Sequence, residues 1–236
     1  MGKNFLRDKG VVISLVALPL LLMSVAKKSA PKDPIQFTLD SKMLVTDSEV
    51  MILALYALTS VVLVAAVTSF FLAFNMKTLL PRLRIVGYTT GEIAGAFFIL
   101  ASLVNLISVI FVWMYSLNAI DIRDPNGFLI SLSLVAIIMS IFGLLTAELV
   151  SSRTLGLYVI LSLAIIDTAF MENPVFSRRY NDDWIGFMPS HHSLTILLRS
   201  IFDTGINWSD GLISVGIYIV ILFISYFVIR SWRQSS

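Results

Sequence analysis

The sequence predicts an all-α integral membrane protein with six transmembrane helices, both termini in the cytoplasm, and a re-entrant helical segment between the fifth and sixth helices. Composition is the first indication: 57% of the 236 residues are hydrophobic, only 14% are charged, and the mean hydropathy is +0.89. An ordinary soluble domain carries nearly twice that share of charged residues. The second indication is a series of apolar runs as long as a bilayer crossing, and the third is a one-sided distribution of basic residues.

Six apolar runs define the expected helices of a single transmembrane domain that covers residues 1–236. The expected spans are residues 11–26, 50–74, 93–117, 128–150, 155–171 and 212–229. Two further apolar strings lie within residues 184–202. The strings, residues 184–189 and 193–202, have six and ten residues, whereas a crossing helix needs about 20 apolar residues. A re-entrant or interfacial pair of half-helices therefore fits this segment better than a seventh span.

The first run, residues 11–26, has a second interpretation as a cleaved leader. Basic residues precede it, and Ser24–Ala26 has the small-x-small pattern of a cleavage site. We expect an uncleaved span that is kinked, or packed by neighbours, at Pro19. The polar segment Lys27–Glu49 that follows is expected to form a modest extracytoplasmic loop.

The distribution of charge predicts the orientation of the six spans. The side that holds both termini has nine basic residues and three acids, a net charge of +6, whereas the other side has eight basic residues and eleven acids, a net charge of −3. Loops rich in lysine and arginine remain in the cytoplasm. The nine basic residues are Lys3, Arg7, Lys9, Lys77, Arg82, Arg84, Arg153, Arg230 and Arg233. Both termini are therefore expected in the cytoplasm of a cell, with the spans in its plasma membrane.

One loop, Lys77–Glu92, connects the second and third spans and has features beyond a simple connection. It holds three basic residues, Lys77, Arg82 and Arg84, and no acid before Glu92. Pro81 is expected to break the arriving helix, because proline lacks an amide donor and clashes with the preceding turn. Glycine permits a tight reversal, and Gly87 and Gly91 supply it. A short exposed helix is predicted here; the simpler interpretation is a basic tether that only sets topology.

Two polar residues lie inside the apolar runs. Asn105 is near the middle of the third span and Asp167 is near the outer end of the fifth. An asparagine in this position usually forms a hydrogen bond between helices, and a substrate contact is the alternative. A carboxylate inside a membrane is costly to bury unpaired, so Asp167 is a functional candidate, with structural pairing as the alternative. Asn105 and Asp167 are therefore the candidate residues of a substrate path.

Several classes of chemistry have no support in the sequence. There is no phosphate-binding GxxxxGK[ST] loop, no HExxH, no GxSxG and no cysteine. His191 and His192 are adjacent, so on a helix they diverge by about 100° and cannot chelate one ion as an i, i+4 pair would. An external metal site completed by acids of the preceding loop is the weaker alternative to solvated polar side chains; those acids are Glu172, Asp182 and Asp183. No catalytic residue, metal site or nucleic-acid surface is predicted.

Three strings resemble the membrane subunits of ABC-2-type exporters. FLRDKGVVISLVALPLLL (5–22) is similar to that family's opening, a charged pre-helix followed by a span with proline. LRIVGYTTGEIAGAFF (83–98) resembles its first cytoplasmic loop, and FMPSHHSLTILLRSIF (187–202) resembles the segment before its final span. The resemblance extends over nearly the whole chain and implies a permease that moves a hydrophobic or amphipathic substrate outward. Drugs, peptide antibiotics and lipids are the substrates it suggests.

The same resemblance implies the partners of the chain. A dimer of permease subunits, as a homodimer or heterodimer, would engage two separate ATP-binding subunits, which would hold the ATP and Mg²⁺; this chain itself would need no cofactor and would not be an enzyme. The residues that would couple to the ATP-binding subunit are Lys77, Arg82, Arg84, Gly87 and Glu92. A bacterial plasma membrane is the implied location.

Two other classes compete with this interpretation. An ion-coupled secondary transporter would use Asp167 as its coupling carboxylate and would need no ATPase, although no internal repeat of the kind common in such carriers is visible. An integral membrane enzyme would need polar groups that converge at one depth, and the sequence offers few. The presence or absence of an ATP-binding partner separates the first class from the exporter.

Overall fold

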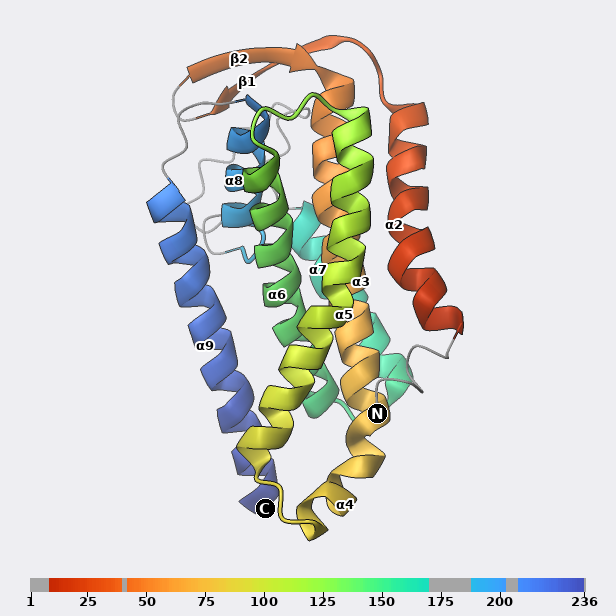
Figure 1. Ribbon diagram of the computed structural model, residues 1–236, viewed down its shortest axis with the longest axis vertical. Helices are drawn as coiled ribbons and strands as arrows, with labels where there is room; N and C mark the ends of the chain where they lie inside the picture. Colours follow the sequence, from red (N-terminus) through yellow and green to blue (C-terminus); the bar gives the residue numbers. More distant parts are fainter. Residues whose placement is uncertain (1–8, 40–41, 170–187, 203–207, 236) are drawn as a thin grey trace.

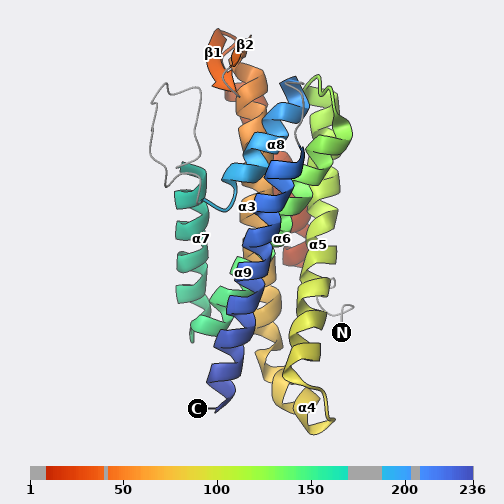
Figure 2. The same ribbon diagram turned by 90° about the vertical axis from the view of Figure 1, so that its left-hand side faces the viewer.

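The computed structural model describes residues 9–39, 42–169, 188–202 and 208–235. These form an elongated bundle of seven α-helices, with a β-hairpin at one end and an eighth, short helix, α4, at the other (Figure 1, Figure 2). The elements are α2 (Lys9–Ser29), β1 (Pro34–Leu39), β2 (Lys42–Asp47), α3 (Ser48–Met76), the 3₁₀ turn η1 (Lys77–Leu79), α4 (Leu80–Ile85), α5 (Thr90–Ala119), α6 (Pro125–Leu149), α7 (Arg153–Ala169), α8 (His191–Phe202) and α9 (Trp208–Ser235).

Three of these helices are long and apolar enough to cross a membrane. They comprise Ser48–Met76, Gly91–Ala119 and Pro125–Leu149, with 29, 29 and 25 residues and mean hydropathies of 2.6, 2.4 and 2.6. At 1.5 Å per residue each exceeds the roughly 30 Å hydrocarbon core. The helical class is thus confirmed, and three helices that could span a membrane lie at the second, third and fourth predicted spans, each slightly longer than predicted. Helices also cover the other three predicted runs, except residues 170–171, which lie outside the described part of the chain.

The β-hairpin is the clearest departure from the expectation of an all-α chain with a plain loop at Lys27–Glu49. β1 and β2 pair antiparallel, with Phe37 opposite Leu44. Phe37 and Leu39 alternate with polar residues along β1 and are both buried, and the Phe37 ring lies 5.1 Å from that of Phe202 at the end of α8. Alternation of this kind is typical of a strand with one covered face. The hairpin is thus attached to the bundle by its apolar face.

The centre of the bundle is a close approach of α3 and α6 at Gly143. A Cβ atom at Gly143 would lie 2.4 Å from the Ala66 carbonyl oxygen and 2.9 Å from the Phe70 amide nitrogen. Those neighbours are backbone atoms of α3, so they cannot move aside at low cost. Small residues allow helix backbones to approach in this way, and in lipid close packing is a main source of helix association. Only glycine permits the observed distance here.

α7 lies against α3 because of a second glycine. The Phe70 side chain is fully buried, and a Cβ atom at Gly156 would lie 2.2 Å from its ring. α7 makes more of its contacts with α3 than with α6, since the ring of Phe70 occupies the place that Gly156 leaves open.

α8 runs alongside the first half of α6. The Ser131 hydroxyl donates to the Ser193 carbonyl (2.5 Å), and the Asp124 amide donates to the Ser200 carbonyl (2.9 Å). α8 therefore begins partway along the bundle and ends near the β-hairpin, as a half-helix rather than a full span (Figure 2). The half-helix α8 agrees with the predicted re-entrant segment, 184–202, over residues 188–202. Residues 184–187 lie outside the described part of the chain.

Substitution of Gly143 tests the α3–α6 contact. Gly143→Ala should lower the free energy of unfolding by about 1–3 kcal/mol, because the added methyl group meets backbone rather than flexible side chains. The midpoint of thermal unfolding in detergent, followed by intrinsic fluorescence, measures the effect. Gly95→Ala in α5 is the matched control, since a Cβ atom there has nothing within 4 Å. Equal midpoints for both variants would contradict the contact.

Candidate functional site

The loop between α3 and α5 folds as a compact projection at the end of the bundle opposite the β-hairpin (Figure 1). α3 ends at Met76, five residues before Pro81, so Pro81 does not end that helix as predicted. It lies instead in the first turn of α4, where proline is tolerated because the missing amide has no helical partner. The predicted short exposed helix is confirmed as α4, which has no buried residue.

Gly87 gives the loop its reversal through backbone conformation. Its φ is +98°, a region that side chains with a Cβ atom rarely adopt. The Gly87 amide donates to the Arg84 carbonyl (2.9 Å) and the Tyr88 amide to the Leu83 carbonyl (3.2 Å). This pair of bonds is the Schellman ending of a helix, with glycine at its left-handed position. A Cβ atom at Gly87 would have open space around it, so conformation rather than crowding requires glycine.

Two residues after Gly87, a capping box starts α5. The Thr89 amide donates to the Glu92 carboxylate (2.8 Å), and the Glu92 amide donates to the Thr89 hydroxyl oxygen (3.3 Å). Both ends of the reversal are thus closed by hydrogen bonds that satisfy otherwise unpaired helix termini. Glu92, predicted to couple to a partner, already has this role within the chain.

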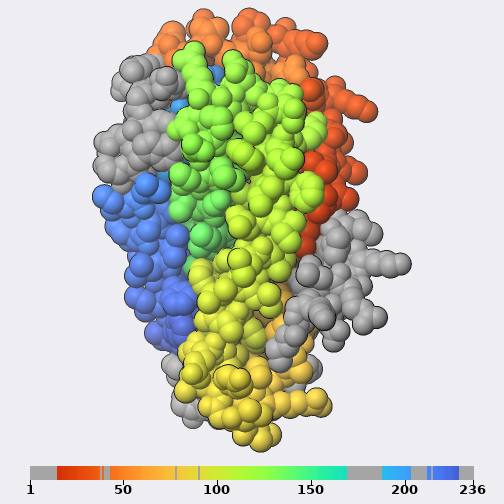
Figure 3. Space-filling view, viewed as in Figure 1, coloured from red at the N-terminus to blue at the C-terminus, as the bar shows by residue number. Residues whose placement is uncertain are grey.

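The outermost part of the projection combines exposed apolar side chains with arginines. Ile85, Val86 and Tyr88 are 86%, 74% and 53% exposed, and Arg82 and Arg84 are exposed beside them. We call these five residues the α4–α5 tip. Figure 3 shows this end of the chain, in yellow, extending below the face formed by α5. A rigid apolar and basic surface of this kind suits a partner with an apolar pocket and acidic surroundings.

Lys77 lies at the base of the projection rather than at its tip. Its ammonium group donates to the Val150 carbonyl (3.1 Å) at the end of α6 and lies 5.0 Å from the centre of the Phe74 ring. A cation at a helix C-terminus is favourable because the last carbonyls are unsatisfied and the helix dipole is negative there. Lys77 therefore connects the α3–α4 junction to α6, a role that sequence spacing did not indicate.

Asn105 is the centre of a buried polar cluster between three helices. Its side-chain amide donates to the Ser69 hydroxyl (2.9 Å) on α3 and the Ser140 hydroxyl (2.8 Å) on α6, and its carbonyl accepts from the Thr68 hydroxyl. A third donation goes to the Ala65 carbonyl (3.3 Å). The side chain is 1% exposed, so this cluster joins α5 to the α3–α6 pair.

Asp167, in the last described turn of α7, receives its hydrogen bonds from Ser190. The Ser190 hydroxyl donates to one carboxylate oxygen (2.6 Å) and the Ser190 amide to the other (3.4 Å). Ser190 directly precedes α8, so the carboxylate lies at the positive end of that helix, where an anion is favourable. The Asp167 side chain is only 4% exposed. This pairing fixes the start of α8 relative to the end of α7.

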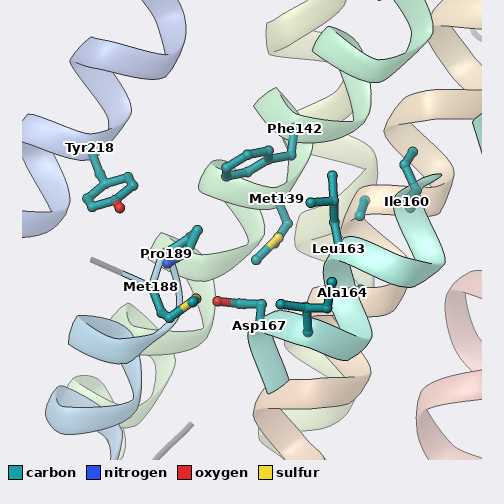
Figure 4. A pocket seen from close by; sticks show the side chains of 11 residues that line it. Met139, Phe142, Ile160, Leu163, Ala164, Asp167, Met188, Pro189 and Tyr218 are labelled. Carbon is teal, nitrogen blue, oxygen red and sulfur yellow. The ribbon is translucent and has the colours of Figure 1, made fainter. Parts of the chain in front are cut away.

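A cavity of about 280 Å³ lies beside Asp167 (Figure 4). Its wall is almost entirely apolar, and Asp167 is the only acidic side chain among the lining residues. The lining side chains come from α3, α6, α7, α9 and the residues before α8, and they include Met139, Phe142, Leu163, Met188 and Tyr218. Asn105 is not among the lining residues. The two predicted substrate-path residues are therefore in separate environments.

Sequence reasoning did not identify Ser190 or Tyr218 as neighbours of Asp167. Ser190 carries a usable signal, since a serine directly before a helix is a preferred capping residue. Nothing in the sequence places Tyr218 at the cavity. Within the described residues no group of three or more His, Cys, Asp or Glu side chains is arranged to hold a metal. The acids suggested for an external metal site, Glu172, Asp182 and Asp183, lie outside those residues.

Comparisons of the chain with protein-family models, with curated proteins and with solved structures give no match.

Replacement of Asn105 tests whether its cluster holds the bundle together. Asn105→Leu should lower the free energy of unfolding by about 0.6–2 kcal/mol, because polar groups on α3 and α6 lose their shared partner in an apolar interior. Chemical or thermal unfolding in detergent measures the loss. Asn118→Leu is the matched control, because Asn118 is exposed on the same helix and donates to the Met114 carbonyl of its own helix. A smaller loss for Asn105→Leu than for the control would contradict the structural role.

Proposed function

We propose that this chain is the membrane-spanning permease subunit of an ATP-driven exporter of the ABC-2 type. The observation that carries the proposal is the α4–α5 tip. It is an exposed, apolar and basic surface held in one conformation by the Schellman bonds and the capping box. A surface that only set topology would need charge but neither exposed apolar side chains nor a fixed shape.

In the proposed arrangement, the six spans of a bacterial plasma-membrane protein are α2, α3, α5, α6, α7 and α9. The α4–α5 tip and both termini are cytoplasmic, and the β-hairpin is outside. The hairpin and the tip lie at opposite ends of the bundle, as this topology requires (Figure 1). α8, a half-helix beside α6, is the re-entrant segment. The net charges of +6 and −3 on the two sides follow the same orientation.

The proposed mechanism uses the tip as the contact with a separate ATP-binding subunit. Arg82 and Arg84 would pair with its acidic residues, while Ile85, Val86 and Tyr88 would enter an apolar depression. ATP and Mg²⁺ would be held by that partner, two copies of which would serve two permease subunits. Movement of the partner would push on α3 and α5 together, because the Schellman bonds and the capping box hold the tip that connects these two helices.

The path of this movement through the bundle would follow the contacts described above. α5 is joined to α3 and α6 through Asn105, and α3 is joined to α6 at Gly143. A displacement of the tip would therefore reach α6 and the cavity beside it. The substrate would be a hydrophobic or amphipathic molecule, in keeping with the apolar wall of that cavity.

A second candidate function is an ion-coupled carrier that uses Asp167. The observation in its favour is the burial of this carboxylate beside a cavity. Such a carrier would transport in vesicles that contain this chain alone and an ion gradient. The exporter would transport only with its ATP-binding subunits and ATP.

The proposed topology can be tested with single cysteines, because the chain has none. Cysteines at Val45 and Asn126 should react with a membrane-impermeant maleimide from outside intact cells, and one at Val86 only after permeabilisation. Val45, Asn126 and Val86 are all exposed, so access to the reagent depends on the side of the membrane. Labelling of Val86→Cys in intact cells would rule out the six-span arrangement.

Coupling can be tested at Gly87. Gly87→Val should leave membrane insertion intact but lower substrate-stimulated ATP hydrolysis of the assembled complex severalfold, because a β-branched residue is strained at a φ of +98° and should alter the tip. Hydrolysis and export are measured at equal protein levels. Gly95→Val, in α5 with open space around its Cβ position, is the control and should retain activity. Normal hydrolysis and export by Gly87→Val would indicate a passive tether.

A further inference from the structure

We infer that the cavity beside Asp167 binds a small amphipathic organic cation, with the apolar part of the ligand in the cavity and its ammonium group on the Asp167 carboxylate. This inference adds a ligand class to the proposed function. It rests on that function in one respect, that the bound ligand is a transported substrate. Binding itself is a property of this chain and needs no ATP-binding subunit.

The size and wall of the cavity specify the apolar part of the ligand. Its volume of about 280 Å³ is near the lower end of the roughly 300–1,000 Å³ range of small-molecule sites. One aromatic ring with a short alkyl chain is of this scale. Phe142, Ile160 and Leu163 provide flat and branched apolar contacts. Met139 and Met188 add flexible thioethers, which adapt to ligands of different shape.

The charge in the cavity specifies the polar end of the ligand. Among the lining residues Asp167 is the only acid, and no lining residue is basic. Within the described residues, the hydrogen bonds to its carboxylate come from Ser190, one to each oxygen. An ionised carboxylate has about four acceptor positions, so it can accept further donors. An ammonium group supplies those donors together with the opposite charge.

Tyr218 provides a second group suited to a cation. It projects from α9 across the cavity from α7, the helix that carries Asp167 (Figure 4). The face of a tyrosine ring attracts cations, and the attraction grows when the site excludes water. An anionic ligand would meet the Asp167 carboxylate with no lining cation to compensate. The expected order of affinity is therefore cation, then neutral analogue, then anion.

Three probes of one shape test this order. They are 4-phenylbutylamine, a cation at neutral pH, the neutral 4-phenylbutan-1-ol and the anionic 4-phenylbutyrate. Binding of radiolabelled amine to the purified chain in phosphatidylcholine nanodiscs is measured directly, with the other two as competitors. The amine should bind saturably and at least about tenfold more tightly than the alcohol, as expected for a hydrogen bond between charged groups. The carboxylate probe should not compete.

Asp167→Asn should abolish the preference for the amine, since it keeps the size of the side chain and an acceptor for Ser190 but removes the charge. Leu163→Trp should weaken the binding of the amine and of the alcohol equally, because the larger side chain fills the cavity. This variant still tests the inference if Asp167→Asn fails to fold. Asp121→Asn, at an exposed acid outside the cavity, is the control and should bind as the wild type. An unchanged amine preference in Asp167→Asn, unchanged binding in Leu163→Trp, or no saturable binding to the wild type would each overturn the inference. None of these results bears on whether an ATP-binding subunit associates, so the proposed function stands or falls separately.

Discussion

The backbone contact between α3 and α6 at Gly143 is the constraint on which the rest of the bundle depends. In lipid, apolar side chains gain little by leaving their surroundings, so helices are held together by close packing and by hydrogen bonds. Gly143 allows the close packing. Asn105 supplies a hydrogen bond, to the Ser140 hydroxyl one turn away from Gly143. Every other long described helix contacts α3 or α6. The distance between α3 and α6 therefore sets the positions of these other helices.

Two regions suited to function lie at different places along this central pair. The α4–α5 tip is at the end of α3, continuous with it through η1 and closed onto α5 by the Schellman bonds and the capping box. The Asp167 cavity is lined by residues of α3, α6, α7 and α9. In the proposed exporter, the first region receives the movement of the ATP-binding subunit and the second holds the substrate. The packing of α3 on α6 is the mechanical connection between them.

The sequence predicted those parts of the fold that depend on composition and local chemistry. Long apolar runs marked α3, α5 and α6, and a basic stretch with Pro81 and Gly87 marked the projection. It did not predict features set by contacts between distant segments: the association of α7 with α3 through Phe70 and Gly156, the bond from Lys77 to the end of α6, or the place of Tyr218 at the cavity. The β-hairpin is an intermediate case, because the alternation around Phe37 was readable but the surface that buries it is formed by α8. Of the candidate site residues, the fixed shape of the loop at Gly87 and Glu92 was accessible from sequence, whereas the enclosure of Asp167 was not.

The most direct test of a coupled permease is the composition of the complex that this chain forms in its native membrane. The tagged chain would be purified in mild detergent and its partners identified and counted by mass spectrometry. We expect one ATP-binding subunit for each copy of the chain. This subunit should no longer co-purify when Arg82 and Arg84 are both replaced by glutamate. A chain that purifies without any ATP-binding protein, and that transports in vesicles on its own, would contradict the proposal.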